Sequence, residues 1–325
     1  MSAKASSTFL LYRNRAITWS LLIVAFFVTL VFGLKWTNLL LLVPLYLVVY
    51  LVWRVYRSVH PSRALALVGI TPEATDLQYR EVELMSRDGL RLNGWFIPRP
   101  GKRAIILAHE LGGSASSLIF HATFLARAGY SVLLVDLRAH GKSQGRVSTF
   151  GVTEANDILG ALDYLHARPS LDPRQVGALG VSLGAQAVLR AAVQSDGLCC
   201  VVLDGLGAAN IKDCGEEPTT LHGRINYSIN WLTYWLGDFM SGMCVPESTH
   251  AVLRRLYCPA LLIACGQGNE VAFNRRFYAA AHEPKILWEL PQAQHAGGLY
   301  FDRDAYQQHV LGFFDLHLKG NATQI

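Results

Sequence analysis

Charged side chains are scarce in this chain, and no long stretch carries a single sign of charge. Only 16% of the 325 residues are Asp, Glu, Lys or Arg, whereas about a quarter is usual in soluble domains. The net charge is a modest +5, and the basic residues form no stripe interleaved with aromatic side chains. These absences argue against a nucleic-acid partner. The length allows one large domain or two ordinary ones.

Cysteine is also sparse, and its spacing argues against a structural metal. The six cysteines include no C-x-x-C pair, and no group of His and Cys has the spacing of a zinc site. Four of them lie in or beside apolar runs, which is typical of buried side chains. Only Cys214 and Cys244 lie in less regular sequence, and they would pair only in an oxidising compartment. We expect reduced thiols, no metal and no cofactor.

Charge is absent altogether from two long apolar runs near the N-terminus, residues 16–34 and 36–53. Each run is about as long as the ~20 residues that cross a bilayer, and Lys35 separates them. We therefore expect residues 1–54 to form a two-helix transmembrane hairpin; a single span followed by an interfacial segment is the alternative. No A-x-A site follows the first run, which disfavours a cleaved signal peptide.

Basic residues flank these two runs on both outer sides, and only Lys35 lies between them. By the positive-inside rule, both ends of the hairpin face the cytoplasm. The charge distribution therefore predicts a multi-pass protein of the cell membrane, with the rest of the chain in the cytoplasm.

After a linker at residues 55–76, short apolar runs alternate with helical patterns throughout residues 77–325. The first two runs flank Asp88 and Gly89, which predicts a hairpin. Strands that alternate with helices predict a mostly parallel sheet with helices on both faces. The expected fold is therefore α/β with eight strands, at 80–86, 90–98, 103–110, 130–137, 175–181, 198–205, 258–266 and 285–291.

One serine interrupts a run of small and apolar residues. Ser182 follows the predicted strand 175–181, precedes a predicted helix, and is flanked by Gly180 and Gly184. Small neighbours let strand and helix approach closely, so that a serine at such a turn projects its hydroxyl at the edge of the sheet. The N–H groups at the start of the helix point to the same place. The pattern predicts a nucleophile; the alternative is a serine that only caps the helix.

The chain resembles the α/β-hydrolase superfamily over roughly residues 77–320. Four segments carry the resemblance: HELGGS (109–114), DLRAHGKSQG (136–145), GVSLG (180–184) and PQAQHAGG (291–298). The resemblance implies a triad in the chain order serine, acid, histidine. Ser182 is then the nucleophile, and His295, in a loop after the last strand, is the base.

The acid of this implied triad has two candidates. The family usually places an aspartate after the seventh strand, where this chain has Asn269 followed by Glu270. An amide cannot balance an imidazolium, so Glu270 is the preferred acid. Asp204, at the end of the sixth strand, is the alternative, because some family members carry their acid there.

The resemblance also implies an oxyanion hole made of two backbone N–H groups. Leu183, directly after the nucleophile, supplies one donor, and Leu111, in the loop after the third strand, supplies the other. Glu110 stands where the family pattern has glycine. A carboxylate aimed at the oxyanion would oppose the charge that develops there, so we expect Glu110 to point away.

The alternation of strands and helices stops between residues 208 and 257, which predicts a helical cap over the site. Trp231, Trp235 and Phe239 in this segment are expected to form an apolar wall of the substrate pocket. Ordinary core packing and contact with a membrane surface are the alternatives.

Together these features predict a membrane-anchored serine hydrolase that cleaves a carboxylic ester or thioester through an acyl-enzyme. The expected substrate is a small-molecule or lipid ester, and the oligomeric state is not indicated. An acyltransferase or a peptidase could use the same triad. Glu110 and Asn269 motivate a further alternative, a catalytically impaired binding module tethered to the membrane.

Overall fold

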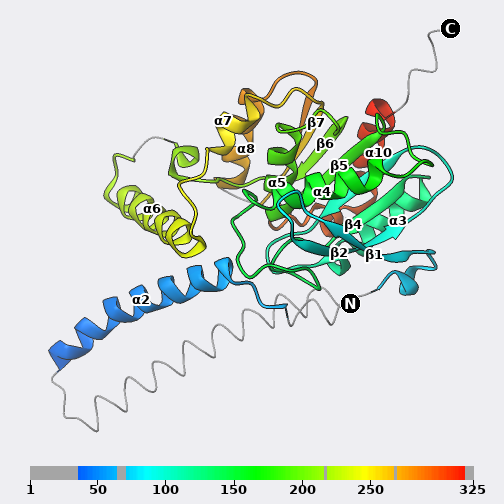
Figure 1. Cartoon of the computed structure of the whole chain (residues 1–325). Helices are drawn as coiled ribbons and strands as arrows, with labels where there is room; N and C mark the ends of the chain where they lie inside the picture. Colours follow the sequence, from blue (N-terminus) through cyan, green and yellow to red (C-terminus); the bar gives the residue numbers. More distant parts are fainter. Residues whose placement is uncertain (1–35, 64–70, 216–217, 267–268, 319–325) are drawn as a thin grey trace. The chain divides into compact units, whose positions relative to one another are not determined.

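The computed structural model describes residues 36–63, 71–215, 218–266 and 269–318 (Figure 1). The chain divides into two compact units, Met1–Arg54 and Val55–Ile325. The second unit contains one eight-stranded sheet, whose strand order is β1-β2-β4-β3-β5-β6-β7-β8. Its strands are β1 (Arg80–Met85), β2 (Arg91–Ile97), β3 (Ala104–Ala108), β4 (Ser131–Val135), β5 (Val176–Val181), β6 (Cys200–Asp204), β7 (Ala260–Cys265) and β8 (Lys285–Leu290).

The sheet is mostly parallel, as the sequence predicted. β1 and β2 form an antiparallel hairpin, and β2 pairs with β4 in the antiparallel sense. The remaining neighbours pair in parallel. Gly89 has a φ of 89° in the turn between β1 and β2, a conformation that glycine adopts without strain. The prediction of an eight-stranded α/β sheet with an antiparallel edge is confirmed.

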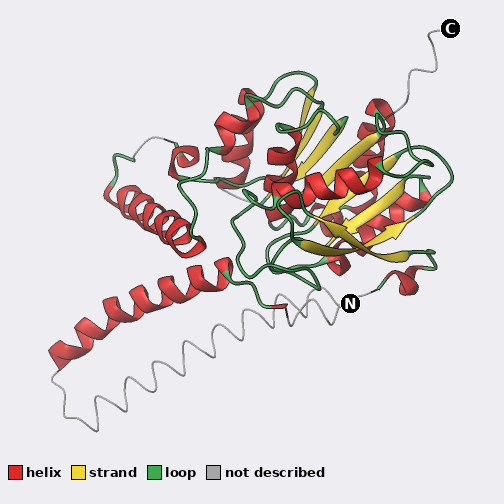
Figure 2. Cartoon of the chain, viewed as in Figure 1, coloured by secondary structure: helices red, strands yellow, loops and turns green. Residues whose placement is uncertain are grey.

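Helices cover both faces of this sheet (Figure 2). Those connecting and following the strands are α3 (Ile119–Arg127), α4 (Ala155–His166), α5 (Leu183–Ala192), α8 (Asn269–Ala280), α9 (Gly298–Phe301) and α10 (Arg303–His317). Successive strand residues point to opposite faces, so every central strand contributes to two cores. The two cores explain why the central strands are apolar throughout instead of alternating with polar residues.

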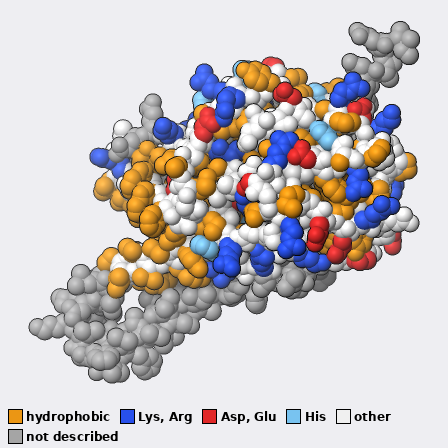
Figure 3. All heavy atoms as spheres, viewed as in Figure 1, with side chains coloured by type: hydrophobic (Ala, Val, Ile, Leu, Met, Phe, Trp, Pro, Cys, Tyr) orange, Lys and Arg blue, Asp and Glu red, His pale blue; other side chains and the backbone are white. Residues whose placement is uncertain are grey.

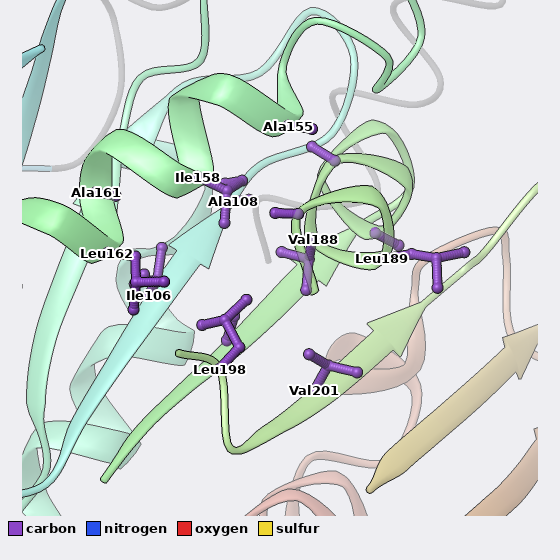
Figure 4. Packing of buried hydrophobic residues seen from close by; sticks show 14 of the residues in the cluster. Ile106, Ala108, Ala155, Ile158, Ala161, Leu162, Val188, Leu189, Leu198 and Val201 are labelled. Atoms are coloured by element: carbon purple, nitrogen blue, oxygen red, sulfur yellow. The ribbon is translucent and has the colours of Figure 1, made fainter. Parts of the chain in front are cut away.

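The alternation is clearest in β3. Ile106 and Ala108 pack with α4 and α5 on one face, where Ile158 and Val188 meet them (Figure 4). Ile105 points to the other face and packs with α3 and α10. All these side chains are fully buried, which places the turn after β5, where Ser182 lies, on a rigid, closely packed support.

The segment between β6 and β7 is helical. It contains the 3-10 helix η4 (Ile211–Cys214), the long helix α6 (Leu221–Ser241) and the short helix α7 (Thr249–Leu253). Thr220 caps the start of α6 by accepting the N–H of Gly223, and Gly242 ends the helix in the left-handed conformation. Figure 1 shows α6 to the side of the sheet, beyond α7 and α8.

The transmembrane hairpin predicted from the sequence is not upheld. The first predicted span, residues 16–34, lies outside the described residues. The second falls in α2 (Trp36–Val59), which contains Pro44 and continues past Arg54 into the second compact unit, where Val55 and Val59 are buried. In the part of the chain that the structure describes, no helix is both long and apolar enough to cross a membrane. That finding overturns the predicted hairpin and the cell-membrane localisation based on it.

Candidate active site

Ser182 occupies a strained turn between β5 and α5. Its φ of 53° and ψ of −105° are unfavourable for a residue with a side chain, and such strain is concentrated at functional sites. Its neighbours must be glycines: a Cβ on Gly180 would lie 2.2 Å from the carbonyl oxygen of Gly184, and one on Gly184 would lie 2.1 Å from that of Ala108. The close packing of β3, β5 and α5 therefore accounts for the G-x-S-x-G pattern.

His295 lies against the hydroxyl of Ser182. It follows β8 in a loop that leads into α9, and its Nε2 is 2.9 Å from the Oγ of Ser182. Its Nδ1 is 2.6 Å from the Oε2 of Glu270, in the first turn of α8. With the ring proton on Nδ1, His295 donates to Glu270 and accepts from the serine hydroxyl. The structure thus brings together three side chains that are separated by up to 113 positions in sequence.

Each carboxylate oxygen of Glu270 has a hydrogen-bond partner. Oε1 accepts the backbone N–H of Cys265 at 2.9 Å, and Oε2 faces His295. The Glu270 side chain is 15% exposed, whereas that of His295 is 55% exposed. The hydrogen bond with Glu270 raises the pKa of His295, and partial burial of the ring opposes this change. The arrangement stabilises an imidazolium when one forms.

Asp204, the alternative acid, lies behind this cluster. It is 1% exposed at the end of β6, and its Oδ2 accepts the hydroxyl of Tyr306 at 2.8 Å. The Sγ of Cys265 lies 3.9 Å from its other oxygen. Burial raises the pKa of Asp204 to about 7. Tyr306 is on α10, and no pattern in the sequence indicates its contact with Asp204, because only the packing of α10 on the sheet brings it there.

The two backbone N–H groups expected to form the oxyanion hole come from separate parts of the fold. Leu183 begins α5, and Leu111 lies in the loop after β3; within the described residues neither N–H donates to a protein acceptor. The carboxylate of Glu110 folds back along its own loop, since Oε1 lies 2.5 Å from where a Cβ of Gly113 would be. The carboxylate also acts on the phenol of Tyr300, whose pKa is raised by burial and by this charge.

The three aromatic residues expected in the pocket wall form a ladder along α6. The rings of Trp231 and Trp235 are stacked with their centroids 6.5 Å apart, and those of Trp235 and Phe239 are stacked with their centroids 5.7 Å apart. They are 51%, 48% and 71% exposed, respectively. Figure 3 shows hydrophobic side chains gathered over α6. The ladder is therefore an exposed surface of the helix and not the lining of a closed cavity.

Comparison with known proteins agrees with the fold described above. The model of the X-Pro dipeptidyl-peptidase family, S15, matches residues 60–215, a range that includes Ser182 but ends before Glu270 and His295. The solved structure of the esterase Pf2001 from Pyrococcus furiosus superposes with a TM-score of 0.66 at 24% identity, covering 80% of this chain and 98% of that one. The chain has the α/β-hydrolase fold, and these matches support its resemblance to that superfamily.

Two curated proteins are similar to this chain in sequence. The uncharacterized protein YfhR of Escherichia coli O157:H7 is 28% identical over 245 residues, which cover 71% of this chain and 79% of that protein. The thiohydrolase aneE of Aspergillus aculeatus is 30% identical over a shorter stretch of 127 residues, 38% of this chain and 40% of that protein. Among the residues that the structure describes, no group of three His, Cys, Asp or Glu side chains is arranged to hold a metal ion.

Proposed function

We propose that this hydrolase cleaves carboxylic esters or thioesters through an acyl-enzyme on Ser182. The observation that carries the proposal is the continuous hydrogen-bonded chain from the Oγ of Ser182 through His295 to Glu270, with contacts of 2.9 and 2.6 Å. A serine nucleophile, a histidine base and a carboxylate that orients the base are the parts needed for acyl transfer. The esterase and thiohydrolase similarities support an ester or thioester substrate, of small-molecule or lipid origin.

Each group has one task in this reaction. His295 Nε2 takes the proton of Ser182 as Oγ attacks the substrate carbonyl carbon, and Glu270 stabilises the imidazolium that forms. The N–H groups of Leu183 and Leu111 donate to the carbonyl oxygen as it becomes an oxyanion. The imidazolium then protonates the leaving alcohol or thiol. A water molecule, deprotonated by His295, releases the carboxylic acid and restores Ser182.

The pH dependence of the reaction should reflect the raised pKa of His295. Only the neutral imidazole can act as base, so kcat/KM should fall as the pH drops through the pKa of His295. Glu270 stabilises the protonated ring and raises that pKa, so the acid limb should lie above the ordinary histidine value of about 6.5. A pH–rate profile with a neutral ester measures it.

In the Glu270→Gln variant the carboxylate charge is gone, so the acid limb of the residual activity should move to lower pH. A limb at or below the ordinary value in the unaltered protein, or one that Glu270→Gln leaves in place, would contradict the assignment of His295 as base.

Peptide hydrolysis is the second candidate function. It is favoured by the match of the S15 family model to residues 60–215, and the same three side chains could attack an amide. An amide needs a poorer leaving group to be expelled, so substrate binding has to position the leaving nitrogen beside His295.

One experiment separates these functions. The full chain is incubated with a fluorophosphonate probe and, in parallel, with p-nitrophenyl butyrate, a thioester of the same acid, and an Xaa-Pro p-nitroanilide. We expect the probe to label Ser182, as mapped by peptide mass, and the two butyric esters to be hydrolysed. Labelling with cleavage of the anilide alone would identify a peptidase. Absence of labelling together with absence of turnover would overturn the proposal of an active serine hydrolase.

A further inference from the structure

Two buried histidines connect the loop that contains Leu111 to the neighbouring loop. His109 directly follows β3, and His140 lies in the loop after β4; both are buried. Their rings meet edge to face, with centroids 4.9 Å apart. The mechanism above uses neither ring, although burying two titratable side chains beside the site is costly unless their nitrogens are hydrogen-bonded.

The backbone partners of His109 determine which of its nitrogens carries the proton. The N–H of Leu137 donates to Nε2 at 3.1 Å, so Nε2 is an acceptor and is not protonated. The proton is therefore on Nδ1, which lies 2.7 Å from the carbonyl oxygen of Glu110 and donates to it. His109 thus holds the carbonyl of the residue that precedes Leu111, together with the N–H of Gly113, which donates to the same oxygen at 3.0 Å.

His140 holds the peptide group on the other side of Leu111 in the same way. Its Nε2 accepts the N–H of Gly112 at 3.0 Å, and its Nδ1 donates to the carbonyl oxygen of Arg138 at 2.8 Å. Both rings must be neutral to accept at Nε2. Burial keeps them neutral, because it lowers the pKa of His109 and lowers that of His140 to about 4.

These contacts determine the direction of the Leu111 N–H. The carbonyl of Glu110 and the N–H of Leu111 belong to one trans peptide plane, in which they point in opposite directions. A carbonyl held by His109 therefore leaves the N–H directed to the other side of the loop. The next peptide plane is held through Gly112, so both planes that meet at the Cα of Leu111 are anchored.

We propose that His109 and His140 are positioning residues that direct the Leu111 N–H toward the oxyanion formed at Ser182. This inference rests on the proposed function, because it assigns a task in that same reaction. The alternative is that the two rings only pack the loops together. The roles differ in a measurable way, since only positioning depends on one particular nitrogen of each ring.

Asparagine and glutamine variants separate the two nitrogens. The side-chain amide of Asn reaches about as far as Nδ1, and that of Gln about as far as Nε2. His109→Asn keeps a donor for the Glu110 carbonyl, whereas His109→Gln does not. At position 140 the order is reversed, because only His140→Gln keeps an acceptor for the Gly112 N–H.

We expect kcat for p-nitrophenyl butyrate to fall about 10- to 100-fold in His109→Gln and His140→Asn, with KM little changed. This is part of the ~10²–10³-fold cost of losing one oxyanion donor. His109→Asn and His140→Gln should each retain several-fold more activity than their partners. Packing alone would make the two amides at each position equivalent or favour the same amide at both.

A second measurement reports on the oxyanion contact itself. Sulfur accepts hydrogen bonds more weakly than oxygen, so a thionoester, with C=S in place of C=O, benefits less from the Leu111 N–H. The ratio of kcat/KM for the ester to that for the thionoester should therefore decrease in His109→Gln and His140→Asn. An unchanged ratio would overturn the proposal.

The outcomes also distinguish this inference from the proposed function. If the unaltered protein neither binds the fluorophosphonate probe nor turns over the ester, the function fails first. If it does both, and the crossed order of the amide variants is absent, only the positioning role is wrong. Thermal unfolding checks that each variant is folded. The crossed order needs the comparison at both positions, because packing could favour one amide; if the variants at one position do not fold, the ester-to-thionoester ratio at the other position decides.

Discussion

Replacing Ser182 with alanine should abolish ester hydrolysis and fluorophosphonate labelling while leaving the fold intact. The substitution removes one hydroxyl from a partly buried turn, and alanine is small enough for the close approach of β3, β5 and α5. Without Oγ no acyl-enzyme can form. We expect kcat to fall by about 10⁴-fold or more, the range in which loss of a serine nucleophile lies in related chemistry. Initial rates with p-nitrophenyl butyrate measure the effect, and circular dichroism checks that the variant is folded.

Ser195→Ala is the matched control. It also removes one hydroxyl, from the turn that follows α5, where the serine only accepts the N–H of Gly197. Its activity should equal that of the unaltered protein. Ester hydrolysis that persists undiminished in Ser182→Ala would show that another residue is the nucleophile.

Glu270→Gln should reduce kcat by about 10³- to 10⁴-fold. Glutamine keeps the shape of the side chain and can still accept the N–H of Cys265. However, its amide cannot stabilise the imidazolium of His295, and its NH₂ group opposite Nδ1 favours the wrong tautomer of the ring. Replacing the carboxylate of a comparable triad by an amide costs about this much. Single-turnover and steady-state rates with the same ester provide the measurement.

Asp204→Asn is the comparison that tests the choice of acid. The hydrogen-bonding contacts of Asp204 are with Tyr306 and Cys265. An asparagine oxygen at this position can still accept the hydroxyl of Tyr306. We expect less than about a tenfold change in kcat, or ~1.4 kcal/mol. If Asp204→Asn were inactive and Glu270→Gln nearly unaffected, the acid would belong to the end of β6.

Local sequence was sufficient to predict the strands, the β-hairpin formed by β1 and β2, and the turn at Ser182. Each of these depends on neighbours in the chain: continuous apolar runs predict strands buried on both faces, and two glycines around a serine permit one specific turn. Apolarity alone was misleading at residues 36–53. The pattern counts uncharged residues, but it does not show that α2 continues beyond Arg54 and that Val55 and Val59 are buried in the second unit.

Which carboxylate faces His295 was decided by tertiary structure. Asp204 ends β6 and Glu270 follows β7, and both strands end at the same edge of the sheet, so the sequence favoured Glu270 but left Asp204 as an alternative. The difference arises because Tyr306, on the last long helix, occupies one oxygen of Asp204, whereas the N–H of Cys265 turns Glu270 toward the ring. Likewise, the tautomers of His109 and His140 depend on the N–H groups of Leu137 and Gly112, each 28 positions away in the chain. Hydrogen bonds between separate loops leave no periodic signal in sequence, because they require only that two backbones meet.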